Sequence, residues 1–156
     1  MIISDLEEET TDLDWFAIDQ QGFIGHFTTG GAGALPRSVA SSKEDLESVC
    51  KYFRSLPLNA TVPLASQKAM AVLATKNDQA REKYLRDFLQ MASRGLYSFD
   101  YQPTGKRPSP YFLVARPEQP LHFNDIPPEI QGLLKKIVLP DVIFVKDHTV
   151  SAETAR

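Results

Sequence analysis

Titratable side chains near the N-terminus are the first candidates for chemistry in this sequence. His26 stands among apolar residues in DWFAIDQQGFIGHF, and a glycine-rich stretch with Gly30, Gly31 and Gly33 follows it. A histidine can act as a general base near neutral pH, and the backbone N–H groups of such a stretch can bind an anion. One hypothesis is therefore a small-ligand-binding module or small enzyme with a pocket beside the Gly30–Gly33 turn and His26 as its titratable group.

The glycine-rich stretch does not match a nucleotide-binding motif. It lacks the Gly-Lys-Ser/Thr ending of a P-loop and the G-x-G-x-x-G spacing of a dinucleotide site, and it leads to Ala-Leu-Pro. The alternative interpretation is structural, because Gly30, Gly31 and Gly33 allow positive φ angles or a close chain crossing where a strand leaves the sheet. We favour the structural interpretation.

Motifs for metal binding or nucleophilic catalysis are missing from the sequence. His26, His122 and His148 are far apart, and none has a second histidine at the spacing of a zinc motif. Cys50, the only cysteine, falls on the apolar side of an expected helix, where burial should raise the thiol pKa and lower its reactivity. Asp14 and Asp19 lie on opposite faces of a strand. We therefore expect no metal, no cofactor and no catalytic residues.

Charge is distributed unevenly along the chain. Residues 1–36 contain seven acidic residues and no Lys or Arg, whereas the remainder has 17 basic and 13 acidic residues. Such asymmetry steers association with an oppositely charged partner, although a solvated arm has the same composition. The candidate partner-binding residues are Glu7, Glu8, Glu9 and Asp12. We expect a basic protein as partner, and the net charge of -3 argues against nucleic acid.

Length and composition indicate one soluble domain. The chain has 156 residues, of which 42% are hydrophobic and 24% charged, within the usual range for a single globular domain. One cysteine excludes an intrachain disulfide, and the sequence has neither a basic, apolar leader nor a membrane-length apolar run. We expect a cytoplasmic protein without a membrane anchor, with residues 1–12 as a flexible acidic arm and residues 148–156 as a flexible tail.

The first structural element predicted is a β-hairpin. Asp19 suits the first position of a type I turn, and Gly22 suits the left-handed position that follows. Pairing of Asp19 with Phe23 divides the hairpin into two faces. Trp15, Ala17, Phe23, Gly25 and Phe27 share one face, and Phe16, Ile18, Ile24 and His26 share the other. Both faces are mostly apolar, which indicates a central position in the sheet with elements packed on each side.

Helical periodicity predicts the elements that cover this hairpin. SSKEDLESVCKYFRSLP forms a helix with a capping box between Ser41 and Glu44. Residues 66–75 are ambiguous between strand and helix, and we favour a helix capped by Ser66. NDQAREKYLRDFLQMASRG is the longest helix and stops at Gly95. PPEIQGLLKKI is a short helix with Pro128 near its start.

Alternating aromatic residues predict a second pair of strands. LYSFDY and YFLVAR are antiparallel partners, joined by a loop that carries Lys106 and Arg107, and VIFVK (142–146) is a last strand. Strands and helices are grouped rather than strictly alternating, so we expect an α+β fold with an antiparallel or mixed sheet of about five strands and three to four helices. The aromatic face formed by Tyr97, Phe99 and Tyr101 also allows a homo-oligomer contact.

The N-terminal third resembles a group of small uncharacterised bacterial proteins. These proteins begin with an acidic arm, a D-W-F-x-x-D-x-x-G-x-I hairpin and a glycine-rich turn before a first helix, and residues 14–24 of this chain match the hairpin pattern. The resemblance implies an immunity-like or other partner-binding protein of a bacterial toxin system, and it carries no catalytic residues. We therefore favour a non-enzymatic protein-binding domain, with the small-ligand module as the alternative.

Overall fold

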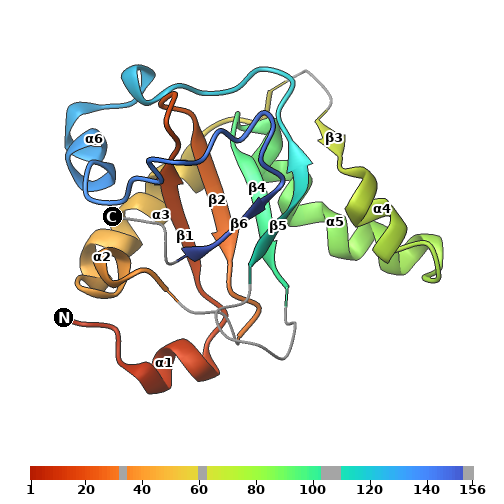
Figure 1. Cartoon of the computed structure of the whole chain (residues 1–156), viewed down its shortest axis with the longest axis horizontal. Coiled ribbons are helices and arrows are strands. Elements are labelled where there is room, and N and C mark those ends of the chain that lie inside the picture. The colour runs from red at the N-terminus through yellow and green to blue at the C-terminus, as the bar shows by residue number, and fades with distance from the viewer. Residues whose placement is uncertain (32–34, 60–62, 103–109, 153–156) are drawn as a thin grey trace.

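The computed structural model describes residues 1–31, 35–59, 63–102 and 110–152. These residues form a mixed sheet with helices packed on it, which confirms the α+β class (Figure 1). The strands are β1 (Asp14–Ile18), β2 (Ile24–Thr28), β3 (Leu64–Ala65), β4 (Tyr97–Tyr101), β5 (Tyr111–Arg116) and β6 (Thr149–Val150). The helices are α1 (Asp5–Thr10), α2 (Arg37–Ala40), α3 (Lys43–Ser55), α4 (Gln67–Val72), α5 (Asp78–Ser93) and α6 (Pro128–Leu134), with a 3-10 turn η1 (Phe123–Asp125).

The prediction of three to four helices was too low. The two helices that it omits, α1 and α2, are six and four residues long. Segments of one or two turns are too short to show helical periodicity, so tertiary contacts decide their conformation.

The strand order is β1-β2-β4-β5-β3, and β6 pairs with the same strand β5 as β3 does. Neighbouring strands are antiparallel except β2 and β4, which are parallel. The antiparallel pairing of LYSFDY with YFLVAR is thus confirmed. Helices α2, α3, α4 and α5 and the short strand β3 lie in the long connection between β2 and β4, which leaves room for this parallel crossover.

The predicted hairpin register is confirmed. Trp15 lies opposite Phe27 and Ile18 lies opposite Ile24, while the Asp19 N–H donates to the Phe23 carbonyl at 3.0 Å. Gly22 has φ +85°, the left-handed conformation that the loop requires.

The two apolar faces of the hairpin predict a central position in the sheet, and this prediction was wrong. Strand β1 is at the end of the strand order. Its free edge is covered by the chain after α6: the Ile18 N–H donates to the Ile137 carbonyl, and the Ile18 carbonyl accepts from the Leu139 N–H. A covered edge strand is buried on both faces like a central one, so the hydrophobic pattern alone does not distinguish the two.

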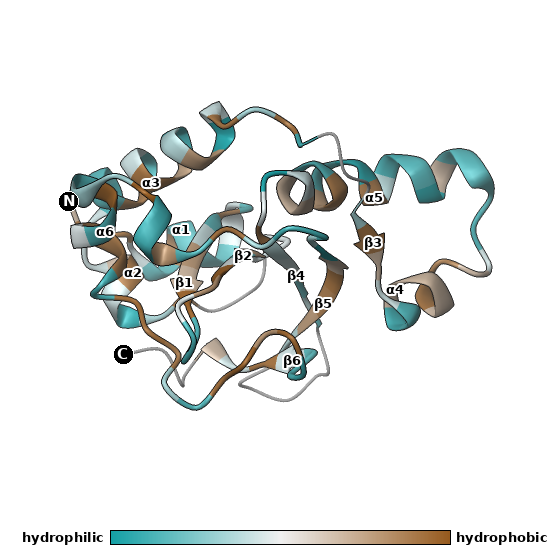
Figure 2. Cartoon of the chain, turned by 90° about the horizontal axis from the view of Figure 1, so that it is seen from above, coloured by the Kyte–Doolittle hydropathy of each residue, from teal (hydrophilic) through white to brown (hydrophobic). Residues whose placement is uncertain are grey.

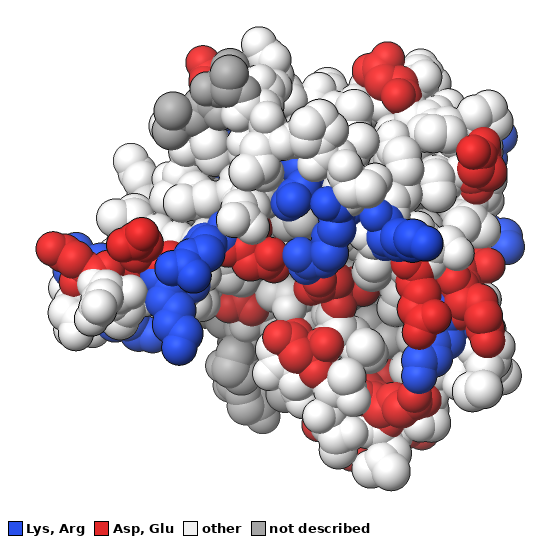
Figure 3. Space-filling model, turned by 180° about the vertical axis from the view of Figure 1, so that it is seen from behind, with Lys and Arg blue, Asp and Glu red and all other residues white. Residues whose placement is uncertain are grey.

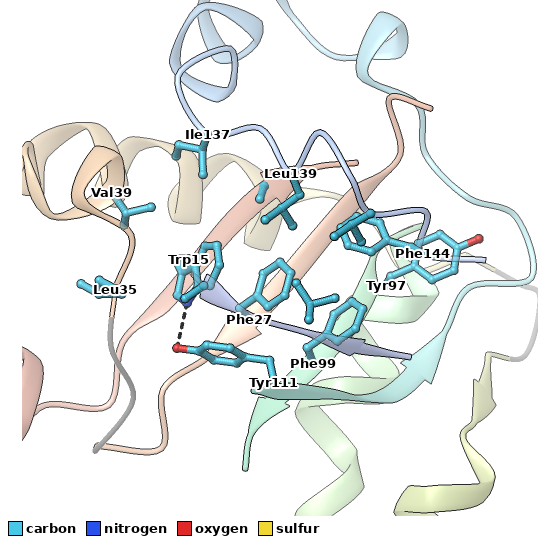
Figure 4. Packing of buried hydrophobic residues seen from close by; sticks show 14 of the residues in the cluster. Trp15, Phe27, Leu35, Val39, Tyr97, Phe99, Tyr111, Ile137, Leu139 and Phe144 are labelled. Atoms are coloured by element: carbon cyan, nitrogen blue, oxygen red, sulfur yellow. Dashed lines mark hydrogen bonds between the residues drawn. The ribbon is translucent and has the colours of Figure 1, made fainter. Parts of the chain in front are cut away.

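Two hydrophobic clusters lie on opposite faces of the hairpin. Figure 2 shows α3 and α5 on one side of the sheet and the C-terminal segment with β6 on the other. The Trp15 cluster, on the second side, includes Phe27, Phe99, Tyr111 and Phe144 (Figure 4). The Phe16 cluster packs Ile18 and Ile24 of the hairpin against α3 and α6. The predicted division of the hairpin residues between two faces is confirmed by these clusters.

A third cluster joins α4 and α5 to β5. It contains Ala69 from α4, Leu73 directly after that helix, Phe88 from α5, and Phe112 and Val114 from β5. Residues 66–75 therefore contain the favoured helix, and Ser66 caps it by accepting from Ala69 N–H at 3.0 Å. Tyr97 and Phe99, part of the proposed oligomer face, are buried in the Trp15 cluster of this chain.

The capping box predicted at Ser41 was wrong by one residue. Ser42 is the N-cap of α3, and its hydroxyl accepts from Asp45 N–H at 3.2 Å. Ser41 instead ends α2, where its hydroxyl donates to the Ser38 carbonyl. Adjacent serines offer equivalent caps, and the preceding helix decides between them.

The strand predicted at 142–146 was also wrong, since none of these residues lies in a strand. The backbone N–H of Ile143 donates to the Asp147 carboxylate and that of Phe144 to the Asp19 carboxylate. Side chains thus replace the ladder partners that a strand would need. The last pairing with the sheet is made by β6, within the expected tail.

Both terminal segments make contacts with the body of the protein. Ile3 is buried in the Trp15 cluster, and its N–H donates to the Ala40 carbonyl. Val150 and Ala152 are buried in the same cluster. Gly33, Lys106 and Arg107, which the sequence singled out, lie outside the described residues. No helix in the described ranges has the length and apolar character needed to cross a membrane.

Candidate functional site

Helix α1 holds part of the acidic arm against α3. A capping box starts the helix, with the Ser4 hydroxyl accepting from Glu7 N–H and the Glu7 carboxylate accepting from Ser4 N–H. Glu7 also accepts from Lys43 Nζ at 2.9 Å. Hydrogen bonds from Ser4 and Lys43 lower the pKa of Glu7 to about 2. The arm therefore presents its other carboxylates from a defined position.

A hollow of about 330 Å³ lies between the arm and α3. Its apolar lining comes from Ile3, Leu13, Leu46 and Cys50. Its charged lining consists of Glu7, Asp12, Asp14 and Glu47, with Lys43 as the one basic side chain among the lining residues. Seen from behind, acidic side chains gather on the side of the molecule where α1 lies (Figure 3). Carboxylates from two distant segments thus surround one concave, partly apolar surface.

The four predicted partner-binding residues differ in their surroundings. Glu9 is exposed on α1, whereas Glu7 is engaged by Ser4 and Lys43. The Asp12 carboxylate accepts from the Thr28 hydroxyl at 2.7 Å and from Gly30 N–H at 3.0 Å. Glu8 lies beside the N–H of Leu35, at 3.5 Å. The arm therefore combines residues that shape it with residues that face solvent.

The glycine-rich turn has the backbone conformation that the structural interpretation requires. Gly30 and Gly31 have φ angles of +61° and +82°. A side chain at either position would meet open space, so positive φ, and not crowding, is the reason for glycine. Neither glycine lines the hollow between the arm and α3, nor two further hollows, one between α4 and β5 and one between α3 and α6.

His26 is completely buried and does not line these hollows either. Its Nδ1 lies 2.7 Å from the Ser98 hydroxyl, and its Nε2 lies 3.2 Å from Asp14 Oδ1. Ser98 is itself fully buried on β4. Ser98, His26 and Asp14 are thus joined by successive contacts, but Ser98 is buried and a substrate would have no access to it. Within the described residues His26 therefore organises neighbouring groups and lines no hollow that could hold a small-molecule substrate.

Asp14 and His26 belong to a cluster of charged groups with Asp87 of α5 and Arg54 of α3. One ligand atom from each of Asp14, His26 and Asp87 lies within 4.8 Å of the others. The Arg54 guanidinium contacts Asp14 and lies 3.0 and 3.3 Å from the two Asp87 oxygens. The cluster therefore fastens α3 and α5 to the open end of the hairpin.

The surroundings of Asp14 favour its charged form. Burial by itself would raise the pKa of this carboxyl, but His26 and then Arg54 outweigh burial and lower the pKa to about 2. Burial and the charge of Asp14 also raise the pKa of the Cys50 thiol to about 12, in line with the low reactivity expected of it.

Replacement of Asp14 by asparagine is expected to lower the free energy of unfolding by about 2 kcal/mol at neutral pH. Asp14 titrates near 3.8 when unfolded and near 2 when folded, so its contribution is complete above about pH 4 and is lost as the pH falls toward 2. Urea unfolding at pH 7 and at pH 2.5 checks this. A difference between D14N and the parent that is equal at both pH values would contradict it.

A second concave surface lies between α4 and β5. It has a volume of about 510 Å³ and is lined by Lys68, Arg116 and His148 together with neutral residues. Lys68 Nζ donates to Gln102 and stands over the Phe112 ring. Positive charge thus gathers at the opposite end of the sheet from the acidic arm.

Comparison with known proteins does not assign a function to this chain, so the functional argument rests on the fold and on the contacts described above. Protein-family models, curated proteins and solved structures give no match to the chain. The resemblance to immunity-like bacterial proteins accordingly stays a prediction.

Sequence reasoning missed two members of the charged cluster, Arg54 and Asp87, and the Ser98 hydroxyl beside His26. No spacing rule connects them, because they come from α3, α5 and β4. The hairpin register did contain a signal that Asp14 lies near His26. The Asp14 side chain points to the same face as that of Phe16, and Phe16 lies opposite His26. Asp14 and His26 are therefore diagonal neighbours on one face.

Proposed function

We propose that this protein is a non-enzymatic, immunity-like protein-binding domain whose acidic N-terminal surface docks a basic protein. The observation that carries the proposal is the convergence of Glu7, Asp12, Asp14 and Glu47 on one hollow with an apolar floor. Apolar contact area with surrounding charge is the usual composition of a protein interface. The lone cysteine suits a reducing compartment, so we place this function in a bacterial cytoplasm.

Charge pairing inside the chain indicates which carboxylates remain for a partner. Glu7 is paired with Lys43, and Asp14 with Arg54. No ion pair within the described residues involves Glu9 or Glu47, and both are exposed. Since no ion pair in the described ranges neutralises them, these two carboxylates can attract a basic surface over a long range.

Exposed apolar side chains add contact area beside these charges. Met1, Ile2 and Leu6 are 79%, 71% and 69% exposed, and all three belong to the N-terminal segment that carries α1. Burial of such side chains stabilises a complex, while the charges around them mainly set the association rate. A basic protein with an apolar patch is the partner that fits this surface.

The double variant Glu9→Gln, Glu47→Gln tests the proposal. Affinity capture from a bacterial lysate at low salt first identifies the partner, which is then purified for kinetic measurements. We expect the double variant to lower the association rate constant and its dependence on salt, and to leave the dissociation rate constant almost unchanged.

The matched control is Glu82→Gln, Glu118→Gln, which removes the same charge at exposed positions outside the arm and α3. It should associate like the parent chain after the small change in net charge is allowed for. Equal kinetics for the two double variants, or capture of no protein at either salt concentration, would contradict the proposed function.

A further inference from the structure

The cluster of Asp14, His26 and Asp87 has an unsatisfied nitrogen at its centre. His26 Nε2 is buried and makes no hydrogen bond within the part of the chain that is described. It lies 3.2 Å from Asp14 Oδ1, yet the direction of the contact does not meet the requirements of a hydrogen bond. A buried polar atom without a partner costs free energy, so its position next to two carboxylates needs an explanation.

The contact made by His26 Nδ1 explains why Nε2 lacks a partner. His26 Nδ1 lies 2.7 Å from the Ser98 hydroxyl, which can accept an N–H from it. With Nδ1–H donated to Ser98, Nε2 presents to Asp14 Oδ1 either a proton, which supports the low pKa of Asp14, or a lone pair, and a cation held between the two atoms can take the place of that proton. Histidines that ligate metals have this arrangement, with the second ring nitrogen donating to a neighbouring acceptor.

From this geometry we propose that Asp14, His26 and Asp87 form a binding site for a zinc-class divalent ion. The three candidate ligand atoms already lie within 4.8 Å of one another. Coordination at about 2.0–2.2 Å from a shared ion brings them closer by a small movement of side chains. One imidazole and two carboxylates favour Zn²⁺ over Ca²⁺ or Mg²⁺, which prefer ligand sets made of oxygen alone.

Arg54 competes with the ion for this position. Its guanidinium contacts both carboxylates, so the ion and Arg54 neutralise the same charges. The Arg54 side chain is 41% exposed and extends from the surface of α3, so solvent can receive it when the ion binds. Asp87 is 48% exposed, which gives the ion a route to the buried imidazole. The ion would then join β1, β2 and α5 directly.

Because Arg54 and the ion compete for the same carboxylates, replacing Arg54 and replacing a ligand should change the affinity for the ion in opposite directions. Zn²⁺ is titrated into the metal-free full chain by calorimetry. Asp87→Asn removes a ligand and is expected to weaken binding by at least about tenfold. Arg54→Gln removes the competing cation and is expected to strengthen binding roughly tenfold. Asp78→Asn on α5 and Lys51→Gln on α3 are matched controls at exposed positions, and their affinities should equal that of the parent.

Coordination is followed separately with Co²⁺, whose visible absorption reports bound nitrogen and oxygen ligands. The absorption should be present in the parent and in Arg54→Gln and absent in Asp87→Asn. Both substituted side chains are partly exposed, so these variants are expected to fold, and circular dichroism checks this. Equal Zn²⁺ affinity in all variants, loss of binding only in His122→Gln, or no binding by the parent would overturn the proposal.

Discussion

Replacement of Trp15 by alanine is expected to lower the free energy of unfolding by about 3–5 kcal/mol. The indole ring is fully buried, stacks on Phe27 with ring centroids 4.1 Å apart, and meets the edge of Tyr111 at 5.4 Å. Its Nε1–H donates to the Tyr111 hydroxyl at 3.2 Å (Figure 4). Alanine leaves a cavity between three strands and the C-terminal segment, and it removes the buried donor of Tyr111.

Urea unfolding followed by far-ultraviolet circular dichroism measures this loss. The control is Leu58→Ala, at a side chain that is 53% exposed, for which we expect a change within about 0.5 kcal/mol. Trp15→Phe should lie between the two, because it keeps an aromatic ring and loses the hydrogen bond. A loss for Trp15→Ala as small as that for Leu58→Ala would contradict the packing described here.

Replacement of Asp19 by alanine is expected to cost about 3 kcal/mol, from the unpaired N–H groups that it leaves. Asp19 is 2% exposed, and its carboxylate accepts three backbone N–H groups, those of Gln21, Phe23 and Phe144, each at 2.9 Å. The first two contacts shape the hairpin turn. The third holds the C-terminal segment over the Trp15 cluster, where water has no access to the Phe144 N–H.

Two measurements separate the local effect of this change from its distant effect. Urea unfolding gives the total loss, and amide hydrogen exchange of Phe144 should become faster in Asp19→Ala. Asp141→Ala, at an exposed position of the same segment, is the control and should change stability by less than about 0.5 kcal/mol. Unchanged exchange at Phe144 would show that the segment is held by packing alone.

Asp19 also explains why the end of the fold was predicted incorrectly. Residues 142–146 have the composition of a strand, but a strand needs a free edge of the sheet. Strand β5 already pairs with β3 and β6 along its outer edge, and β1 pairs with the chain around Ile137 and Leu139. The Asp147 and Asp19 carboxylates instead accept the backbone N–H groups of residues 143 and 144. The contact between Phe144 and Asp19 spans 125 positions, which a local sequence pattern does not include.

The candidate sites depend on sequence and fold to different degrees. The acidic character of residues 1–36 is a property of the sequence, and it led to the arm as a partner-binding segment. The hollow beneath that arm requires the contact between Glu7 and Lys43, and the charged cluster requires α3 and α5 to meet at the hairpin. Residues as distant as His26 and Asp87 become neighbours only through this packing.

The sequence by itself determined the local elements of this protein. The hairpin register follows from Asp19, Gly22 and alternating apolar residues, and the helices at 43–55, 78–93 and 128–134 follow from periodicity and end signals, since these interactions connect residues a few positions apart. The tertiary structure decided the parallel pairing of β2 with β4, the coverage of the β1 edge and the meeting of Asp14, His26, Arg54 and Asp87. These depend on burial and hydrogen bonding between distant segments, whose partners are selected when the whole core packs.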